Sequence, residues 1–184
     1  MKFKVTEIIG DEPVTKEEAK SHLRVVHEEE DDYIDALIKT ARQMVENLQF
    51  RSIPEQKIKL FLDEFPEKAE WIKLPRPPLK ELLEFKYTDK DGEEYDFEDY
   101  LLDKESAPAL IYPEQYWPDK ELKKTNGIEI EYRAGYEEVP ETTKQAMLLL
   151  ISNWYENREP VFDGAVNQIP FTVEALLNQE RVYY

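Results

Sequence analysis

The sequence predicts an α+β fold, a mainly α-helical bundle formed by helices from the two ends of the chain, with a β-rich region inserted between them. Two observations predict it. Apolar residues recur at helical spacing near both ends, and in the middle the pattern changes to the alternation of β-strands. We expect residues 1–54 and 138–184 to be the N-terminal and C-terminal helical parts of one core, and residues 55–137 to be the inserted β-rich region.

Two helices are predicted in the N-terminal part. Thr15-Lys-Glu-Glu18 is typical of a capping box, and predicts a helix from there to about Val26. A second helix follows an acidic stretch, whose Asp31 and Asp32 suit the positive end of a helix dipole. Its apolar face consists of Ile34, Leu37, Ile38, Ala41, Met44, Val45 and Leu48.

Alternating residues predict strands in the middle of the chain, beginning with Ile58, Leu60 and Leu62 on one face. Further strands are predicted at 71–74, 82–88, 95–100 and 127–133. The proline-rich segment 74–79 excludes helix and central strand, and residues 103–126 are predicted to form an irregular surface loop.

Two more helices are predicted in the C-terminal part. Pro140 is well placed to begin the first, whose apolar face consists of Ala146, Met147, Leu150, Ile151 and Trp154. The second is expected from about Thr172 to Gln179.

Composition excludes several classes of protein. The chain has 184 residues, 41% of them hydrophobic, which is enough for a core. Its net charge of −17 opposes ordinary DNA binding, which depends on Lys and Arg at phosphates. The absence of cysteine excludes disulfides and fits a reducing compartment. We expect neither a signal peptide nor a membrane span, since no apolar run approaches roughly 20 residues.

The sequence offers no convincing catalytic, metal or cofactor site. His22 and His27 are five residues apart and would not share a helical face. Glu129 and Glu131 would lie on one strand face and could serve a glycosidase, but a solvated face explains them more simply. With five glycines there is no Gly-rich phosphate loop and no Gly-x-Ser-x-Gly motif. We therefore expect no enzyme and no cofactor.

Two segments are candidates for contact with a partner. In "ISNWYENREPVF" at 151–162, a buried helical face ends and the polar chain begins, and Trp, Tyr and Arg are the residue types that dominate interaction hot spots. The end of the chain, "NQERVYY", shows no core periodicity. The candidate interface residues are Trp154, Tyr155, Arg158, Val182, Tyr183 and Tyr184.

Four segments together resemble the head-tail connector (adaptor, head-completion) proteins of tailed bacteriophages and prophage remnants. They are "VTKEEAKSHLRV" at 14–25, "DDYIDALIKTARQMVENLQFRSI" at 31–53, "VPETTKQAMLLLISNWYENRE" at 139–159 and "IPFTVEALLNQERVY" at 169–183. Between them, "KLPRPPLKELLEFKYTDKDGEEY" at 73–95 is similar to the β-region inserted in longer members.

The resemblance implies a helical-bundle fold and a structural role in the virion. The chain would be made in the host bacterial cytoplasm and form a ring between the portal protein and a tail or head-closure protein. That ring would be a dodecamer on the portal, or a smaller species in isolation, and DNA would pass through it without specific binding. The acidic composition fits a channel that repels the duplex, although it also makes free subunits repel one another.

Two other functions remain open from the residues alone. An acidic protein of this size could mimic DNA and occupy the cleft of a nucleic-acid enzyme. A hydrolase using Glu129 and Glu131 is the second alternative.

Overall fold

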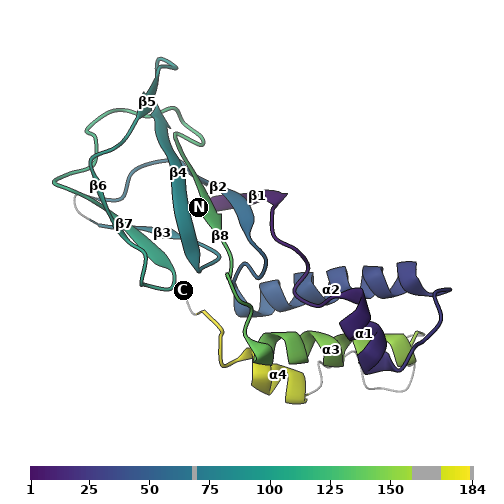
Figure 1. The fold of residues 1–184 in the computed structure, drawn as a ribbon. Coiled ribbons are helices and arrows are strands. Elements are labelled where there is room, and N and C mark those ends of the chain that lie inside the picture. The colour runs from purple at the N-terminus through teal and green to yellow at the C-terminus, as the bar shows by residue number, and fades with distance from the viewer. Residues whose placement is uncertain (68–69, 159–170, 183–184) are drawn as a thin grey trace, which may run out of the picture. The chain divides into compact units, whose positions relative to one another are not determined.

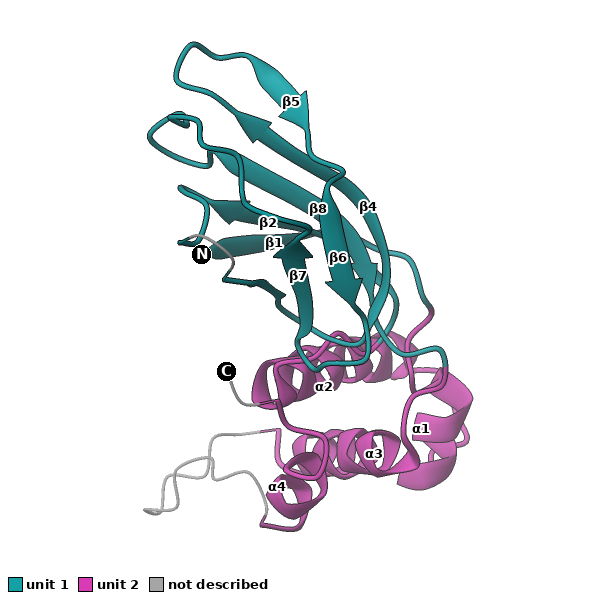
Figure 2. Ribbon diagram, turned by 90° about the vertical axis from the view of Figure 1, so that its left-hand side faces the viewer, with its two compact units in different colours: residues 1–10, 54–137, 184 teal, residues 11–53, 138–183 magenta. Residues whose placement is uncertain are grey.

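The computed structural model of the protein describes residues 1–67, 70–158 and 171–182, and these divide into two compact units (Figure 1). One unit consists of residues 1–10 and 54–137, and the other of residues 11–53 and the described part of 138–183 (Figure 2). Each unit has its own cluster of buried apolar side chains. We call them the β unit and the helical unit.

Two antiparallel sheets form the β unit. The larger has the strand order β1-β2-β8-β4-β5 and the smaller the order β3-β7-β6. Their bounds are β1 Lys2–Ile8, β2 Gln56–Leu62, β3 Ile72–Leu74, β4 Leu79–Thr88, β5 Glu94–Asp96, β6 Tyr100–Asp103, β7 Ala109–Pro113 and β8 Ile128–Ala134.

One apolar core joins the two sheets. It contains Ile58 and Leu60 of β2, Ile130 of β8 and, from the smaller sheet, Leu74 and Ile111, all at most 1% exposed. The alternation expected from Ile58 is confirmed at Ile58 and Leu60, which are buried while Lys57 and Lys59 remain half-exposed; Leu62, at the end of the strand, is half-buried. A fully buried tyrosine, Tyr132, satisfies its hydroxyl by donating to the carbonyl oxygen of Pro75 at 2.7 Å.

The described residues of the helical unit form four helices: α1 Lys16–Leu23, α2 Asp31–Gln49, α3 Glu141–Glu156 and α4 Phe171–Leu177. The predicted capping box is confirmed, because Thr15 accepts from the Glu18 amide while the Glu18 carboxylate accepts from the Thr15 amide. The core consists of the apolar faces of α2 and α3, closed by Ala19, Val173 and Leu177. None of these helices is long and apolar enough to cross a membrane, within the residues that are described.

The prediction of a mainly helical bundle is wrong, because the protein is an α+β fold in which a β-sheet is central. Two strands were missed. Strand β1 escapes notice because all seven of its side chains are exposed, so no buried face marks it. Strand β7 lies in the segment predicted to be an irregular loop, directly after Pro108 and ending at Pro113, yet it pairs with both β3 and β6. The sheets have a core of their own and are more than an appendage of a helical bundle.

Candidate interaction surfaces

Two of the predicted interface residues lie in a compact cluster at the C-terminal end of α3. The guanidinium carbon of Arg158 is 4.8 Å from the ring centroid of Tyr33 and 4.8 Å from that of Tyr155. The two rings lie 6.1 Å apart, tilted by 35°. A cation at this distance from two aromatic faces is attracted by both. The cluster therefore joins the beginning of α2 to the end of α3 within the helical unit.

Glu30, just before α2, completes this cluster. Arg158 Nη2 donates to Glu30 Oε1 at 2.6 Å, and the Tyr155 hydroxyl donates to Glu30 Oε2. These hydrogen bonds, first from Tyr155 and then from Arg158, hold the pKa of the Glu30 carboxyl below its usual range. The same carboxylate raises the pKa of the Tyr155 hydroxyl and of the Arg158 guanidinium. We call Glu30, Tyr33, Tyr155 and Arg158 the α2–α3 end cluster.

The other predicted interface residues differ in accessibility. Trp154 is half-buried and packs against the helical core, and its carbonyl oxygen accepts from the Tyr33 hydroxyl at 3.4 Å. Val182 is 4% exposed. Tyr183 and Tyr184 lie outside the described residues. The structure thus brings Tyr155 and Arg158 together, buries Val182 and leaves the role of all six residues at an interface a prediction.

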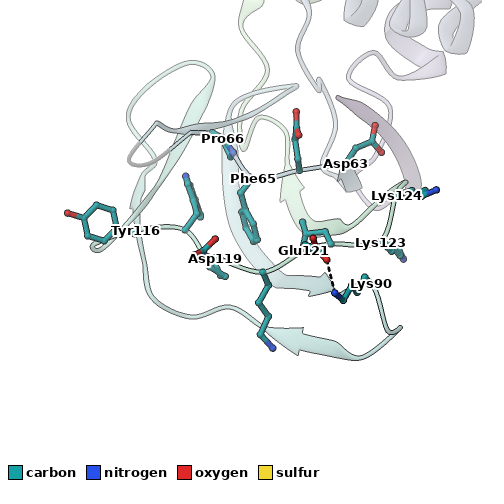
Figure 3. A pocket seen from close by; sticks show the side chains of 14 residues that line it. Asp63, Phe65, Pro66, Lys90, Tyr116, Asp119, Glu121, Lys123 and Lys124 are labelled. Atoms are coloured by element: carbon teal, nitrogen blue, oxygen red, sulfur yellow. Dashed lines mark hydrogen bonds and ion pairs between the residues drawn. The ribbon is translucent and has the colours of Figure 1, made fainter.

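A separate surface in the β unit is a hollow of about 890 Å³ (Figure 3). Residues 63–66, Lys90 and residues 116–124 line it, so most of its wall comes from the segment predicted to be an irregular loop. Phe65 stacks on Trp117, with ring centroids 5.4 Å apart and an angle of 15°. The Trp117 indole N–H donates to the carbonyl oxygen of Glu70 at 2.8 Å, which fixes the ring.

Charges of both signs surround this aromatic floor. Lys90 and Glu121 form an ion pair of 2.7 Å across the rim, drawn as a dashed line in Figure 3. Tyr116 is 72% exposed. The hollow was not predicted from the sequence, because its lining comes from three separate segments. Its aromatic residues, Phe65, Tyr116 and Trp117, follow no regular spacing that would have indicated it.

The carboxylates considered for catalysis have lysine partners. Glu131 forms an ion pair with Lys57 at 3.1 Å, and Glu129 accepts a short hydrogen bond from Lys59. The described residues contain no group of three or more His, Asp or Glu side chains that could hold a metal ion. Of the two histidines, His27 lies 3.5 Å from Glu29.

Comparison with known proteins shows that this fold is similar to that of virion components. The family model described as "Head completion protein" matches residues 12–168. A solved structure, "Neck of empty GTA particle computed with C6 symmetry", superposes with a TM-score of 0.83 at 22% identity, covering 100% of this chain and 97% of the other.

Two more solved structures have the same fold. The chain from "Virion of native gene transfer agent (GTA) particle" gives a TM-score of 0.81, and that from "Neck of native GTA particle computed with C12 symmetry" gives 0.79. Both are 21% identical and cover 100% of this chain and 97% of theirs. No curated protein matches.

Proposed function

This chain belongs to the head completion protein family, and on that premise we propose that it forms the ring that joins the portal to the tail side of the virion. Membership makes it a structural virion protein of the connector between head and tail. The match over residues 12–168 carries the proposal, because it spans both the helical unit and the β unit. The finer points proposed here are the ring, its partners and the surfaces that contact them.

We propose a ring of twelve copies on the portal, open at its centre for DNA. Two solved structures of the same fold are of necks computed with C12 and with C6 symmetry, and a ring of twelve is compatible with both. The net charge of −17 supports a lumen that positions DNA by repulsion, since few cations are available to bind phosphates. The proposed partners are the portal protein above and a tail or head-closure protein below.

The α2–α3 end cluster and Trp154 are the proposed contact region in the helical unit. Tyr183 and Tyr184, which lie outside the described residues, stay candidates from the sequence, whereas Val182 is buried. Arg158 is exposed although it contacts two tyrosines, so a partner carboxylate could still reach it. Arginine and tyrosine are among the residue types enriched at interaction hot spots. We also propose that the chain works without catalysis, which the lysine partners of Glu129 and Glu131 support.

The test is the mass of the full chain in solution by light scattering, with and without the portal protein encoded beside it. We expect a closed ring, or a small species that assembles on the portal. A species that stays small and does not bind the portal would overturn the proposal. Arg158→Ala should weaken portal binding. Arg181 is also an exposed arginine of the helical unit, near the chain end. Comparing Arg158→Ala with Arg181→Ala therefore distinguishes a contact at the α2–α3 end cluster from one at the terminal segment.

A further inference from the structure

The five-stranded sheet ends in two open edges, β1 and β5. Within the described parts of the chain, no strand pairs with the outer side of either. An edge strand presents unpaired backbone N–H and C=O groups, and proteins usually shield such edges or use them for association. Strand β1 also exposes apolar side chains, since Phe3 is 41% exposed, Val5 38% and Ile8 49%.

The side chains of β1 differ between its two faces. Phe3 lies opposite Leu60 and Val5 opposite Ile58, so both are on the inner face with the buried core. Lys2 and Lys4 are therefore on the outer face. The neighbouring lysines of β2, Lys57 and Lys59, are already paired with the carboxylates of β8.

Lys2 and Lys4, by contrast, form no ion pair with any residue that the structure describes. The first half of the β1 edge, with Lys2 and Lys4, is therefore basic on its outer face and apolar on its inner face. After a shift in register, Glu7 lies opposite Lys57 and places one carboxylate further along the outer face.

The β5 edge has the opposite charge in the same arrangement. Glu94 lies opposite Thr88 and Asp96 opposite Lys86, whereas Tyr95 lies opposite Tyr87 and stacks on it with centroids 5.2 Å apart. Across the sheet, Asp96 lies opposite Lys86, Lys86 opposite Glu129, Glu129 opposite Phe61, and Phe61 opposite Lys2. Residues that lie opposite one another share a face of the sheet, so both carboxylates of β5 are on the same outer face as the two lysines of β1. Glu94 and Asp96 also lack an ion pair among the described residues.

We propose that neighbouring copies of this chain join edge to edge, with β1 of one copy beside β5 of the next. The inference rests on the proposed function, because it assigns the contact that closes the ring. The rotation that relates ring subunits keeps every outer face on the same side. Lys2 and Lys4 then face Glu94 and Asp96 of the neighbour. Phe3 and Val5 lie on the same inner face as its Tyr95, whose ring stacks on Tyr87 and has the Lys120 ammonium over it at 3.5 Å.

Charge selects this pairing over the alternatives. Two β1 edges would place lysines against lysines, and two β5 edges would place carboxylates against carboxylates. Only unlike edges attract, and since each copy carries one of each, the contact repeats head to tail as a ring requires. It also supplies local attraction between subunits whose net charge of −17 otherwise drives them apart.

Charge reversal and mixing test the contact. The first variant carries Lys2→Glu with Lys4→Glu, so both of its edges are acidic; the second carries Glu94→Lys with Asp96→Lys, so both are basic. We expect each variant alone to lose the ring that the wild type forms, alone or on the portal. An equimolar mixture should regain it, because acidic and basic subunits can alternate. Light scattering at low ionic strength, with circular dichroism as a check of folding, measures the result.

The matched control for the first variant is Lys39→Glu with Lys104→Glu, which makes the same change in net charge at exposed sites outside both edge strands. This variant should still assemble. If both edge variants assemble like the wild type, or if their mixture regains nothing, the edge contact is wrong although the ring stands. If wild-type protein forms no ring even with the portal, the proposed function fails, and this inference fails with it.

Discussion

The backbone N–H of Val182 donates to the carbonyl oxygen of Gln49 at 3.0 Å, which fastens the end of the chain to the last turn of α2. Val182 is buried beside this bond, and the Gln49 side chain in turn donates toward Thr143 of α3 and the Leu177 carbonyl of α4, both at 3.4 Å. Three segments distant in sequence thus meet at Gln49. A residue predicted from sequence to contact a partner has a place in the core of its own unit.

Val182→Ala should therefore destabilise the helical unit. Removing a buried valine's methyl groups costs about 2 kcal/mol, from lost burial and the cavity that remains. Urea unfolding followed by circular dichroism measures the change. Val26→Ala is the matched control, since Val26 is 95% exposed and the same substitution there should cost less than about 0.5 kcal/mol. Equal effects at the two positions would contradict the burial of Val182.

The α2–α3 end cluster predicts a dependence of stability on pH. The pKa of Glu30 is lowered in the folded protein from its ordinary 4.5, so the folded state binds fewer protons than the unfolded state as pH falls. Its contribution is complete above about pH 4.5 and is lost as pH falls through the lower, folded-state pKa. Tyr155→Phe removes the largest cause of this shift.

Urea midpoints of the wild type and Tyr155→Phe, compared from about pH 7 to pH 3, test this expectation. The difference in stability should be present at neutral pH and shrink in acid. Tyr116→Phe is the control, because that tyrosine is 72% exposed. A difference that stays constant across the whole range would contradict the coupling to Glu30.

Gly135 is required by close packing in the β unit. Its φ is +139°, and a Cβ added there would lie 2.3 Å from the Pro54 carbonyl oxygen and 2.7 Å from the Glu55 Cα. Gly92 has a φ of +90° but open space around it, so Gly92→Ala measures the cost of backbone strain without overpacking. We expect Gly92→Ala to cost about 1 kcal/mol and Gly135→Ala about 1–3 kcal/mol more, from overpacking.

Urea unfolding followed by tryptophan fluorescence can measure the difference in stability between the two variants. Trp71 and Trp117 lie in the β unit and Trp154 lies in the helical unit. Equal costs for the two glycine substitutions would show that the contact with Pro54 is not tight.

The proposed edge contact can also be trapped covalently, because the chain contains no cysteine. Lys4→Cys combined with Glu94→Cys, or with Asp96→Cys, should give a ladder of disulfide-linked subunits on mild oxidation of the assembled protein. A disulfide needs Cα atoms within about 4.4–6.8 Å, so only adjacent strands qualify. Lys104→Cys with Asp96→Cys is the control, and a ladder of equal yield there would argue against the edge contact.

Sequence predicted the helices well and the sheets only in part. Helix α2 was found because nineteen residues carry one continuous apolar face. Strand β1 was missed because an edge strand with both faces exposed has no buried side to reveal its period. The predicted strand at 95–100 is instead two strands in different sheets, β5 and β6, a division that depends on their partners.

The candidate sites show the same limit. Tyr155 and Arg158 were selected by residue type, but their partner Glu30 is 125 and 128 positions away in the chain. No local pattern connects residues at that distance. The complementary edges β1 and β5 likewise become visible only through a register that passes across five strands.

The division of the chain between the two units sets the order in which they can be completed during synthesis. When Ala134 has left the ribosome, all eight strands of the β unit have been made, whereas the helical unit still lacks α3 and α4. Because domains generally fold as units and the earlier-completed part folds first, the sheets can close while α1 and α2 still expose their apolar faces. The helical unit, with the end cluster proposed to meet the portal, is then the last part of each subunit to mature.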